Sequence, residues 1–204
     1  MPSGRTHDRI TIWALPVIVG ATFWHTRNGN ITLLIATGFM LGGLMFGPDL
    51  DIHSVQYQRW GWFRWIWYPY QKSLRHRSFL SHGPIIGTTF RVVYFTLILS
   101  IVVVTVLVIA EKLGNVTLNW QMLANEVGNT ILSHKTEFLA LFLGLEFGAM
   151  SHYLSDWTGS TYKRIKKQGI RAYLNGLSNS GKIKKRKPTI RKGKGQRLKS
   201  KGKQ

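Results

Sequence analysis

Apolar residues are gathered into a few uninterrupted blocks along this chain, and polar or aromatic stretches separate them. The longest block, residues 92–110, contains no charged side chain. Because a helix rises about 1.5 Å per residue, this block is long enough to cross a bilayer core of about 30 Å. The pattern therefore predicts a membrane helix here.

Three further blocks complete the apolar pattern. Residues 31–47 are uncharged and contain glycines that suit close packing between membrane helices. Residues 10–24 are apolar but shorter, and no small-residue cleavage site follows them, so we expect this segment to be retained. Residues 138–154 are interrupted by Glu146 and His152, which predicts a helix that turns a polar face toward protein or water. We predict an all-α, integral membrane bundle of about four helices.

The connections between the blocks have distinct characters. The Asn28-Gly29 pair predicts a tight turn between the first two helices. Residues 56–72 interleave tryptophan and tyrosine with arginine, which is typical of a segment lying in the membrane interface. A surface for stacking nucleic-acid bases is the alternative, although such surfaces usually line a water-exposed groove. We expect residues 111–135 to form a polar connection.

The net charge of +20 is concentrated at one end of the chain. Seventeen of the 28 Lys and Arg residues lie from residue 163 onward, and no acidic residue accompanies them. This segment is rich in Lys, Gly and Ser and poor in large apolar residues, so it cannot build a core. We predict a membrane-embedded domain at residues 1–162 and a basic, disordered tail at 163–204.

The charge distribution also predicts the orientation in the membrane. If four helices cross in alternation, both termini and the 47–90 loop share one side with most of the basic residues. The other side has only Arg27, Lys112 and Lys135. The positive-inside rule then places both termini on the cytoplasmic face, in a plasma or thylakoid membrane.

Residues able to bind metal adjoin the ends of the four apolar blocks, all on the predicted cytoplasmic side. They are His7, Asp49, Asp51, His76, His82, His152 and Asp156. His25 and His134 fall on the opposite side and are excluded, and His53 is left undecided. The chain contains no cysteine, so nitrogen and oxygen atoms must hold any metal.

Local spacing supports this grouping. His152 and Asp156 are four residues apart, so on a helix they share one face and can bind one ion, although such a pair can also simply stabilise a helix end. Asp49 and Asp51 follow Pro48, in a turn where both carboxylates can converge.

Mixed imidazole and carboxylate ligands suit a divalent zinc, manganese or iron ion, and we prefer zinc. Seven candidates exceed the four ligands of a closed zinc site, which favours two ions or one catalytic ion with additional carboxylates around it. Asp51 is the best candidate for a general base or a bridging carboxylate. A metal-activated water could then hydrolyse an ester or phosphoester.

At these residues the chain resembles a family of YdjM-like, membrane-bound, metal-dependent hydrolases. The shared features are an early histidine, a Pro-Asp-x-Asp turn, a His-Arg-x-x-x-Ser/Thr-His segment and a closing Ser-His-x-x-x-Asp. The likeness is to a cyanobacterial branch of predicted metal-binding proteins (DUF2227-like) and, more distantly, to zinc-dependent phospholipase C and nuclease domains. The resemblance implies a metal site and hydrolysis but does not identify the substrate. We expect a phosphoester or lipid-like substrate at the cytoplasmic face. Ser81 stands where many relatives have threonine.

Two alternatives compete with a metal-dependent hydrolase. His152-x-x-x-Asp156 is similar to the last motif of membrane phosphatidic-acid phosphatases, but their Pro-Ser-Gly-His motif is absent because Arg5 follows Gly4. The chain could instead be a non-enzymatic membrane adaptor whose tail binds RNA, ribosomes or anionic lipid by charge alone. No specific protein partner is predicted beyond the lipid bilayer.

Overall fold

The computed structural model describes residues 4–74, 78–114 and 117–169, and in these ranges the chain is all-α, without a strand. Its elements are α1 (Gly4–Thr26), α2 (Gly29–Leu44), the 3-10 turn η1 (Pro48–Asp51), α3 (Val55–Gln58), the 3-10 helix η2 (Gly61–Trp67), α4 (Tyr68–Ser73), α5 (Phe79–His82), α6 (Ile86–Gly114), α7 (Trp120–Ser133) and α8 (Lys135–Gln168). The chain divides into two units, residues 1–160 and 161–204. The first unit contains all the helices that build the candidate site.

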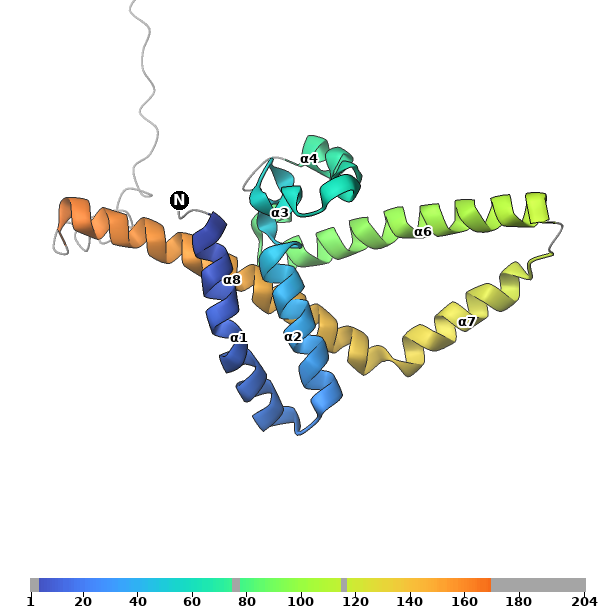
Figure 1. Cartoon of the computed structure of the whole chain (residues 1–204), viewed down its shortest axis with the longest axis horizontal. Coiled ribbons are helices and arrows are strands. Elements are labelled where there is room, and N and C mark those ends of the chain that lie inside the picture. Colours follow the sequence, from blue (N-terminus) through green and yellow to red (C-terminus); the bar gives the residue numbers. More distant parts are fainter. Residues whose placement is uncertain (1–3, 75–77, 115–116, 170–204) are drawn as a thin grey trace, which may run out of the picture. The chain divides into compact units, whose positions relative to one another are not determined.

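Helices α1 and α2 form the predicted antiparallel hairpin (Figure 1). The turn differs in detail from a simple Asn-Gly turn. Arg27 takes the left-handed conformation with φ of 51°, and the Asn28 side chain caps α2 by accepting hydrogen bonds from the backbone N–H groups of Asn30 and Ile31. This cap satisfies two of the N–H groups that a helix start leaves unpaired.

Helices α2 and α8 cross with their backbones in direct contact. Four glycines form this crossing, namely Gly38, Gly42, Gly144 and Gly148. A Cβ added at Gly42 would collide with the carbonyl of Leu145, and one at Gly148 would collide with the carbonyl of Phe39. Since larger residues would force the backbones apart, glycine is required for this approach.

Helix α1 packs against the same region of α2. A Cβ at Gly43 would lie 2.5 Å from the Thr11 side chain, and Thr11 is almost completely buried. The Thr11 hydroxyl donates a hydrogen bond of 3.1 Å to the carbonyl of His7, one turn earlier. The hairpin and α8 therefore meet near the residues that are candidates for metal binding.

The aromatic segment contributes to the core as well as to the surface. Trp67 and Tyr70 are fully buried, and Trp67 packs edge-on against Phe46. Trp62 and Trp65 are 90% and 62% exposed. The prediction that this whole segment lies in the membrane interface was therefore too broad, since the side chains at 67 and 70 fill the protein interior.

Helix α7 occupies a stretch that we expected to be a polar connection. Asn119 caps it by accepting a hydrogen bond from the N–H of Met122. Apolar residues recur at helical spacing through Leu123, Val127 and Ile131, which gives the helix an apolar face that the overall polarity of the segment concealed. No residue of α7 is buried.

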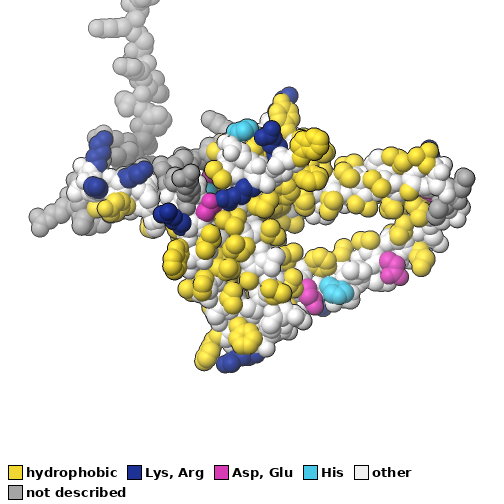
Figure 2. All heavy atoms as spheres, viewed as in Figure 1, with side chains coloured by type: hydrophobic (Ala, Val, Ile, Leu, Met, Phe, Trp, Pro, Cys, Tyr) yellow, Lys and Arg dark blue, Asp and Glu magenta, His cyan; other side chains and the backbone are white. Residues whose placement is uncertain are grey.

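Two of the described helices are long and apolar enough to cross a membrane, namely α6 and α8. Helix α2 is apolar but has only 16 residues. Hydrophobic side chains run along the exposed surface of α6 (Figure 2). By length and composition the structure thus supports two candidate spans, where the sequence pattern predicted four.

Helix α8 ends later than the predicted domain boundary. It continues to Gln168, so the first residues assigned to the tail are helical. Residues 170–204, which carry most of the predicted disordered tail, lie outside the described residues.

The glycine crossing yields a first prediction. Gly42→Ala should lower the free energy of unfolding by about 1–3 kcal/mol, because the added methyl group has no room against the Leu145 carbonyl. Gly20→Ala is the matched control, since nothing lies within 4 Å of its Cβ position in the middle of α1. It should be neutral or stabilising, because alanine favours helix by about 0.5–1 kcal/mol over glycine. Denaturant unfolding followed by tryptophan fluorescence measures both, and equal midpoints for the two variants would contradict the packing argument.

Candidate metal centre

Six of the seven predicted ligands lie in the described part of the chain, and they form two groups of three. The first contains His7, His152 and Asp156, and the second contains Asp49, Asp51 and His82. Within each group one ligand atom per residue lies within 4.8 Å of the others. The groups draw on the start of α1, the η1 turn, α5 and the middle of α8.

In the first group α1 and α8 bring two imidazole rings together. The rings of His7 and His152 stack with their centroids 3.9 Å apart and an angle of 21° between their planes. His7 Nε2 lies 3.4 Å from Asp156 Oδ1. His152 and Asp156 share one face of α8, as their spacing predicts.

In the second group a single histidine lies between two carboxylates. His82 Nδ1 is 3.5 Å from Asp51 Oδ2, and His82 Nε2 is 3.7 Å from Asp49 Oδ1. The Ser81 hydroxyl oxygen also lies 2.8 Å from His82 Nδ1. Both nitrogens of this ring therefore face oxygen atoms.

Asp49 connects the two groups. Its Oδ2 atom lies 3.2 Å from His152 Nε2, while its Oδ1 atom faces His82. The two oxygens of one carboxylate are thus directed at different histidines. Asp49 therefore lies between the two groups, and Asp51 contacts His82 within the second group.

Hydrogen bonds to backbone carbonyls hold the η1 turn in place. The Gln71 amide donates to the carbonyls of Leu50 and Ile52 at 2.9 and 3.0 Å. The Gln56 amide donates at 2.9 Å to the carbonyl of Gly43, near the end of α2. These bonds fix both carboxylates of the turn relative to α2.

A second set of polar contacts positions His82. Arg91 is fully buried, and it donates to the carbonyl of Ser81 at 2.8 Å and to the hydroxyl of Thr88 at 2.9 Å. Ile85 adopts the left-handed conformation with φ of 64°, and its N–H donates to the Glu146 carboxylate at 2.9 Å. A non-glycine residue is strained in that conformation, so the contact with α8 helps to hold the α5–α6 turn.

The electrostatics of the site favour deprotonated ligands. Burial raises the pKa of Asp49, but the neighbouring His152 and His82 imidazoles outweigh it and hold this pKa well below its usual range. Burial, with the neighbouring His152, lowers the pKa of His7, against the opposing effect of Asp156. Metal ions require carboxylate and neutral imidazole ligands, which these shifts favour.

The buried donor atoms suit a cation. His7 and His152 are 7% and 5% exposed, yet the Nδ1 atoms of both have no hydrogen-bond partner among the described residues. The same holds for Oδ1 of Asp49 and Oδ1 of Asp156. Buried polar atoms normally have partners, so these orphaned nitrogens and oxygens fit divalent metal ions in both donor type and number.

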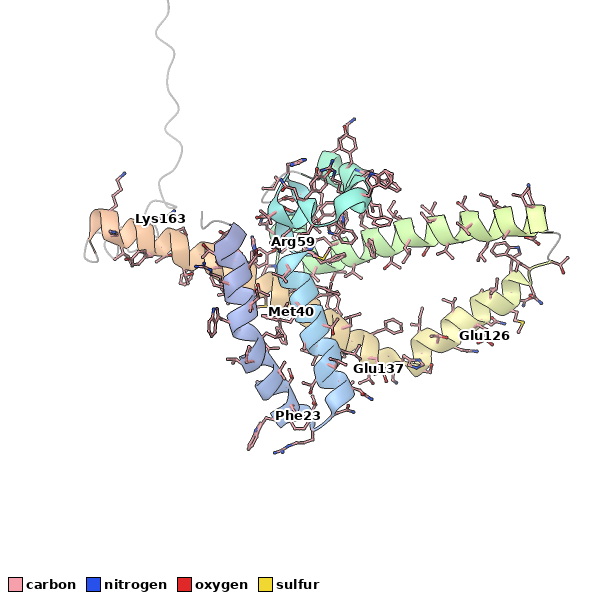
Figure 3. The ribbon with its side chains drawn as sticks, viewed as in Figure 1. Phe23, Met40, Arg59, Glu126, Glu137 and Lys163 are labelled. Atoms are coloured by element: carbon pink, nitrogen blue, oxygen red, sulfur yellow. The ribbon has the colours of Figure 1, made fainter. Side chains whose placement is uncertain are left out.

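A cavity of about 280 Å³ opens beside the first group. Its described lining includes His7, His152 and Asp156, as well as Asp49 and His53. Asp8 also lies on the wall, in a two-point ion pair with Arg59, which Figure 3 labels near the end of α2.

The remaining histidines have different outcomes. His76 lies outside the described residues. His25 and His134 belong to neither ligand group, in keeping with their exclusion. His53, which the sequence left undecided, lines the cavity, and its ring centroid lies 4.8 Å from that of Tyr57.

Sequence reasoning missed the residues that support the ligands, above all Arg91 and Gln56. A signal was present for Arg91, because a charged residue directly before a long apolar block is costly to bury unless it has a structural task. Gln56 carried no such signal, since a single glutamine in an aromatic segment is unremarkable.

Comparisons with known proteins agree with a metal centre. The family described as "Uncharacterized metal-binding protein (DUF2227)" matches residues 2–166. A protein of Aquifex aeolicus (strain VF5), described only as "Uncharacterized protein", is 38% identical over 58 residues. That segment covers 28% of this chain and 40% of the relative. No solved structure matches the chain.

We predict that His152→Ala lowers the metal content of the purified protein, because the imidazole contacts both the first group and Asp49. His25→Ala is the matched control, because it also removes an imidazole but His25 belongs to neither ligand group. This variant should leave the metal content unchanged. Mass spectrometry of metals per chain, after expression in metal-supplemented medium, measures both variants. Equal metal content in wild type and His152→Ala would exclude this group as a metal site.

Proposed function

Because this chain belongs to the DUF2227 family of uncharacterized metal-binding proteins, we propose that it is a membrane-embedded hydrolase that uses divalent metal ions, preferably zinc, to cleave a phosphoester of a lipid-like substrate. The observation that carries the proposal is the pair of ligand groups joined by Asp49, one of which borders a cavity. A metal centre that only stabilised the fold would need no accessible side.

The assignment of two ions follows from the ligand count. Each group offers three residues, and Asp49 directs one oxygen toward each histidine across the gap between the groups. The absence of thiolates favours zinc, manganese or iron bound by imidazole and carboxylate. Divalent ions held there would supply Lewis-acid activation of a water molecule and of a phosphoryl oxygen.

The side chains around the cavity have separate tasks in this proposal. Asp51 was the sequence-based candidate for a general base, but its side chain is fully enclosed and is not among the described cavity residues. Its position favours a role as a ligand. Asp156 is 27% exposed and lines the cavity, so the one of its carboxylate oxygens that does not bind an ion is better placed to accept a proton from an attacking water. The cavity wall also contains the Asp8 carboxylate, which is paired with the Arg59 guanidinium.

The exposed surface of α6 supports a location in the membrane. This helix is long and strongly apolar, and the most apolar stretch within it has no buried residue. Val93, Leu97 and Val106 are each 58% exposed. Contact of such apolar side chains with water costs free energy that their burial would recover. An apolar surface of this length needs a covering, and lipid provides one. We propose that α6 and α8 span the bilayer and that α1 and α2 complete a four-helix membrane bundle, with the site and both termini cytoplasmic.

The exposed aromatic residues support a position of the cavity near lipid headgroups. Trp62 and Trp65 project from η2, and the neighbouring α4 supplies Gln71, which holds the η1 turn of the metal site. Tryptophan is favoured at the headgroup level of a bilayer. A phosphoester within a lipid headgroup is therefore the substrate class that the site can reach.

One observation favours the adaptor alternative, namely the concentration of basic residues from residue 163 onward. Such a tail would bind nucleic acid or anionic lipid without sequence preference. It does not account for a cavity beside converging histidines and aspartates. The two functions are separable by experiment, because catalysis requires the helical domain and adaptor binding requires the tail.

Membrane insertion is tested by alkaline carbonate extraction of cell membranes. The wild-type chain should stay in the pellet, whereas Val103→Lys should reduce the pelleted fraction, since a charge at the centre of a span costs about 3 kcal/mol. Leu113→Lys is the control at the end of the same helix, where lysine can reach the headgroups. Release of the wild-type chain by carbonate would contradict a membrane location.

Hydrolysis is tested with bis(4-nitrophenyl) phosphate and with vesicles containing phosphatidic acid. Turnover should require added zinc or manganese and should stop with a chelator. Asp49→Asn should reduce turnover by roughly 100-fold or more, since even residues that merely support metal ligands contribute about 10–100-fold. Glu126→Gln, an exposed carboxylate on α7, is the control and should keep wild-type turnover (Figure 3).

A truncated chain that lacks residues 182–204 separates the two functions in the same assay. A hydrolase should retain its metal-dependent turnover without this segment. Absence of turnover by the full chain, together with loss of polyanion binding by the truncated chain, would favour the adaptor.

A further inference from the structure

We infer that the two ion positions are unequal: the position formed by His7, His152 and Asp156 faces the substrate and exchanges its ion, whereas the position formed by Asp51 and His82 is enclosed. The inference rests on the proposed metal centre of the preceding subsection. It assigns to each half of the centre a role that neither the family description nor the motif pattern distinguishes.

The two groups differ in their contact with the cavity. All three residues of the first group line the cavity, and Asp49 joins them. Neither Asp51 nor His82 is among its described lining residues. Catalytic metal sites keep a coordination position open to water or substrate, while structural sites are closed by protein ligands. Among the described residues, the first position borders a cavity that can supply such an open place.

The two groups also differ in the burial of their carboxylates. The Asp51 side chain is fully enclosed, compared with 27% exposure for Asp156. Ser81, Leu50 and Arg91, which surround Asp51 and His82, are 0% exposed, and His82 is the partly exposed edge of the second group at 17%. An ion beside Asp51 would therefore have to leave past the His82 ring, whereas an ion beside Asp156 would leave directly through the cavity.

The size and polarity of the cavity indicate what the outer ion would contact. Its volume of about 280 Å³ lies at the lower limit for small-molecule pockets, which are roughly 300–1,000 Å³. His53, Ser54 and Gln58 add hydrogen-bonding groups to its wall. The space suits a phosphate group with a short attached portion, while the acyl chains of a lipid would have to remain outside.

Each position keeps three residues of its own when the other is empty. Loss of the outer ion leaves Asp49, Asp51 and His82 around the enclosed ion, and loss of the enclosed ion leaves His7, His152 and Asp156 around the outer one. We therefore expect the outer ion to leave without disturbing the inner one.

The test measures zinc release from the full-length, zinc-loaded protein after rapid mixing with excess chelator and a colorimetric zinc indicator. Wild type should release two zinc ions per chain in two phases of equal amplitude, with rates that differ by at least about tenfold. His152→Ala should retain mainly the slow phase, and His82→Ala should retain mainly the fast phase. Inorganic phosphate at millimolar concentration should slow the fast phase in wild type and leave the slow phase unchanged.

A single release phase in wild type, or a phosphate effect on the slow phase alone, would overturn the inference. If the variants fail to fold, the wild-type release curve with and without phosphate still decides the question. The result is independent of turnover. Two unequal phases without hydrolysis would uphold the inference and reject the hydrolase, whereas hydrolysis by a protein that releases one ion in one phase would do the reverse.

Discussion

The backbone contact between α2 and α8 at Gly42 and Gly148 sets the geometry on which the metal centre depends. Asp49 follows α2 within two turns of Gly42, and His152 lies one turn beyond Gly148. The close crossing therefore brings a carboxylate and an imidazole from residues 103 apart in the chain to 3.2 Å. Bulkier residues at the crossing would widen the gap by more than a metal coordination bond tolerates.

Supporting contacts surround this crossing on both sides. Thr11 ties α1 to Gly43, and Gln56 ties the aromatic segment to the carbonyl of the same glycine. Arg91 fixes the backbone next to His82 from within α6. His7 and His82 thus adjoin backbone groups that bond to the buried side chains of Thr11 and Arg91, so these parts of the site are arranged before an ion binds. Such preorganisation is what allows a site to select a geometry.

The sequence allowed the all-helical class to be predicted. It also singled out the candidate ligands, because each motif adjoins an apolar block and the predicted alternation of helices places those ends on one side. It did not reveal which residues pair. The division into two groups, with Asp49 rather than Asp51 between them, depends on how α2 and α8 cross, which a linear pattern does not encode. Helix α7 and the burial of Trp67 were missed for a related reason, since average polarity conceals which face of a segment meets its neighbours.

The distribution of ligands along the chain also constrains how the protein is made. His7 is among the first residues synthesised, yet its partners His152 and Asp156 belong to the last described helix. No ion can be held by the first group until α8 has been produced and has packed against α2. The early helices must therefore reach their places without an ion in the first group, while His7 still lacks both of its partners. Metal capture by the first group is then expected to be a late step that follows completion of the helical domain.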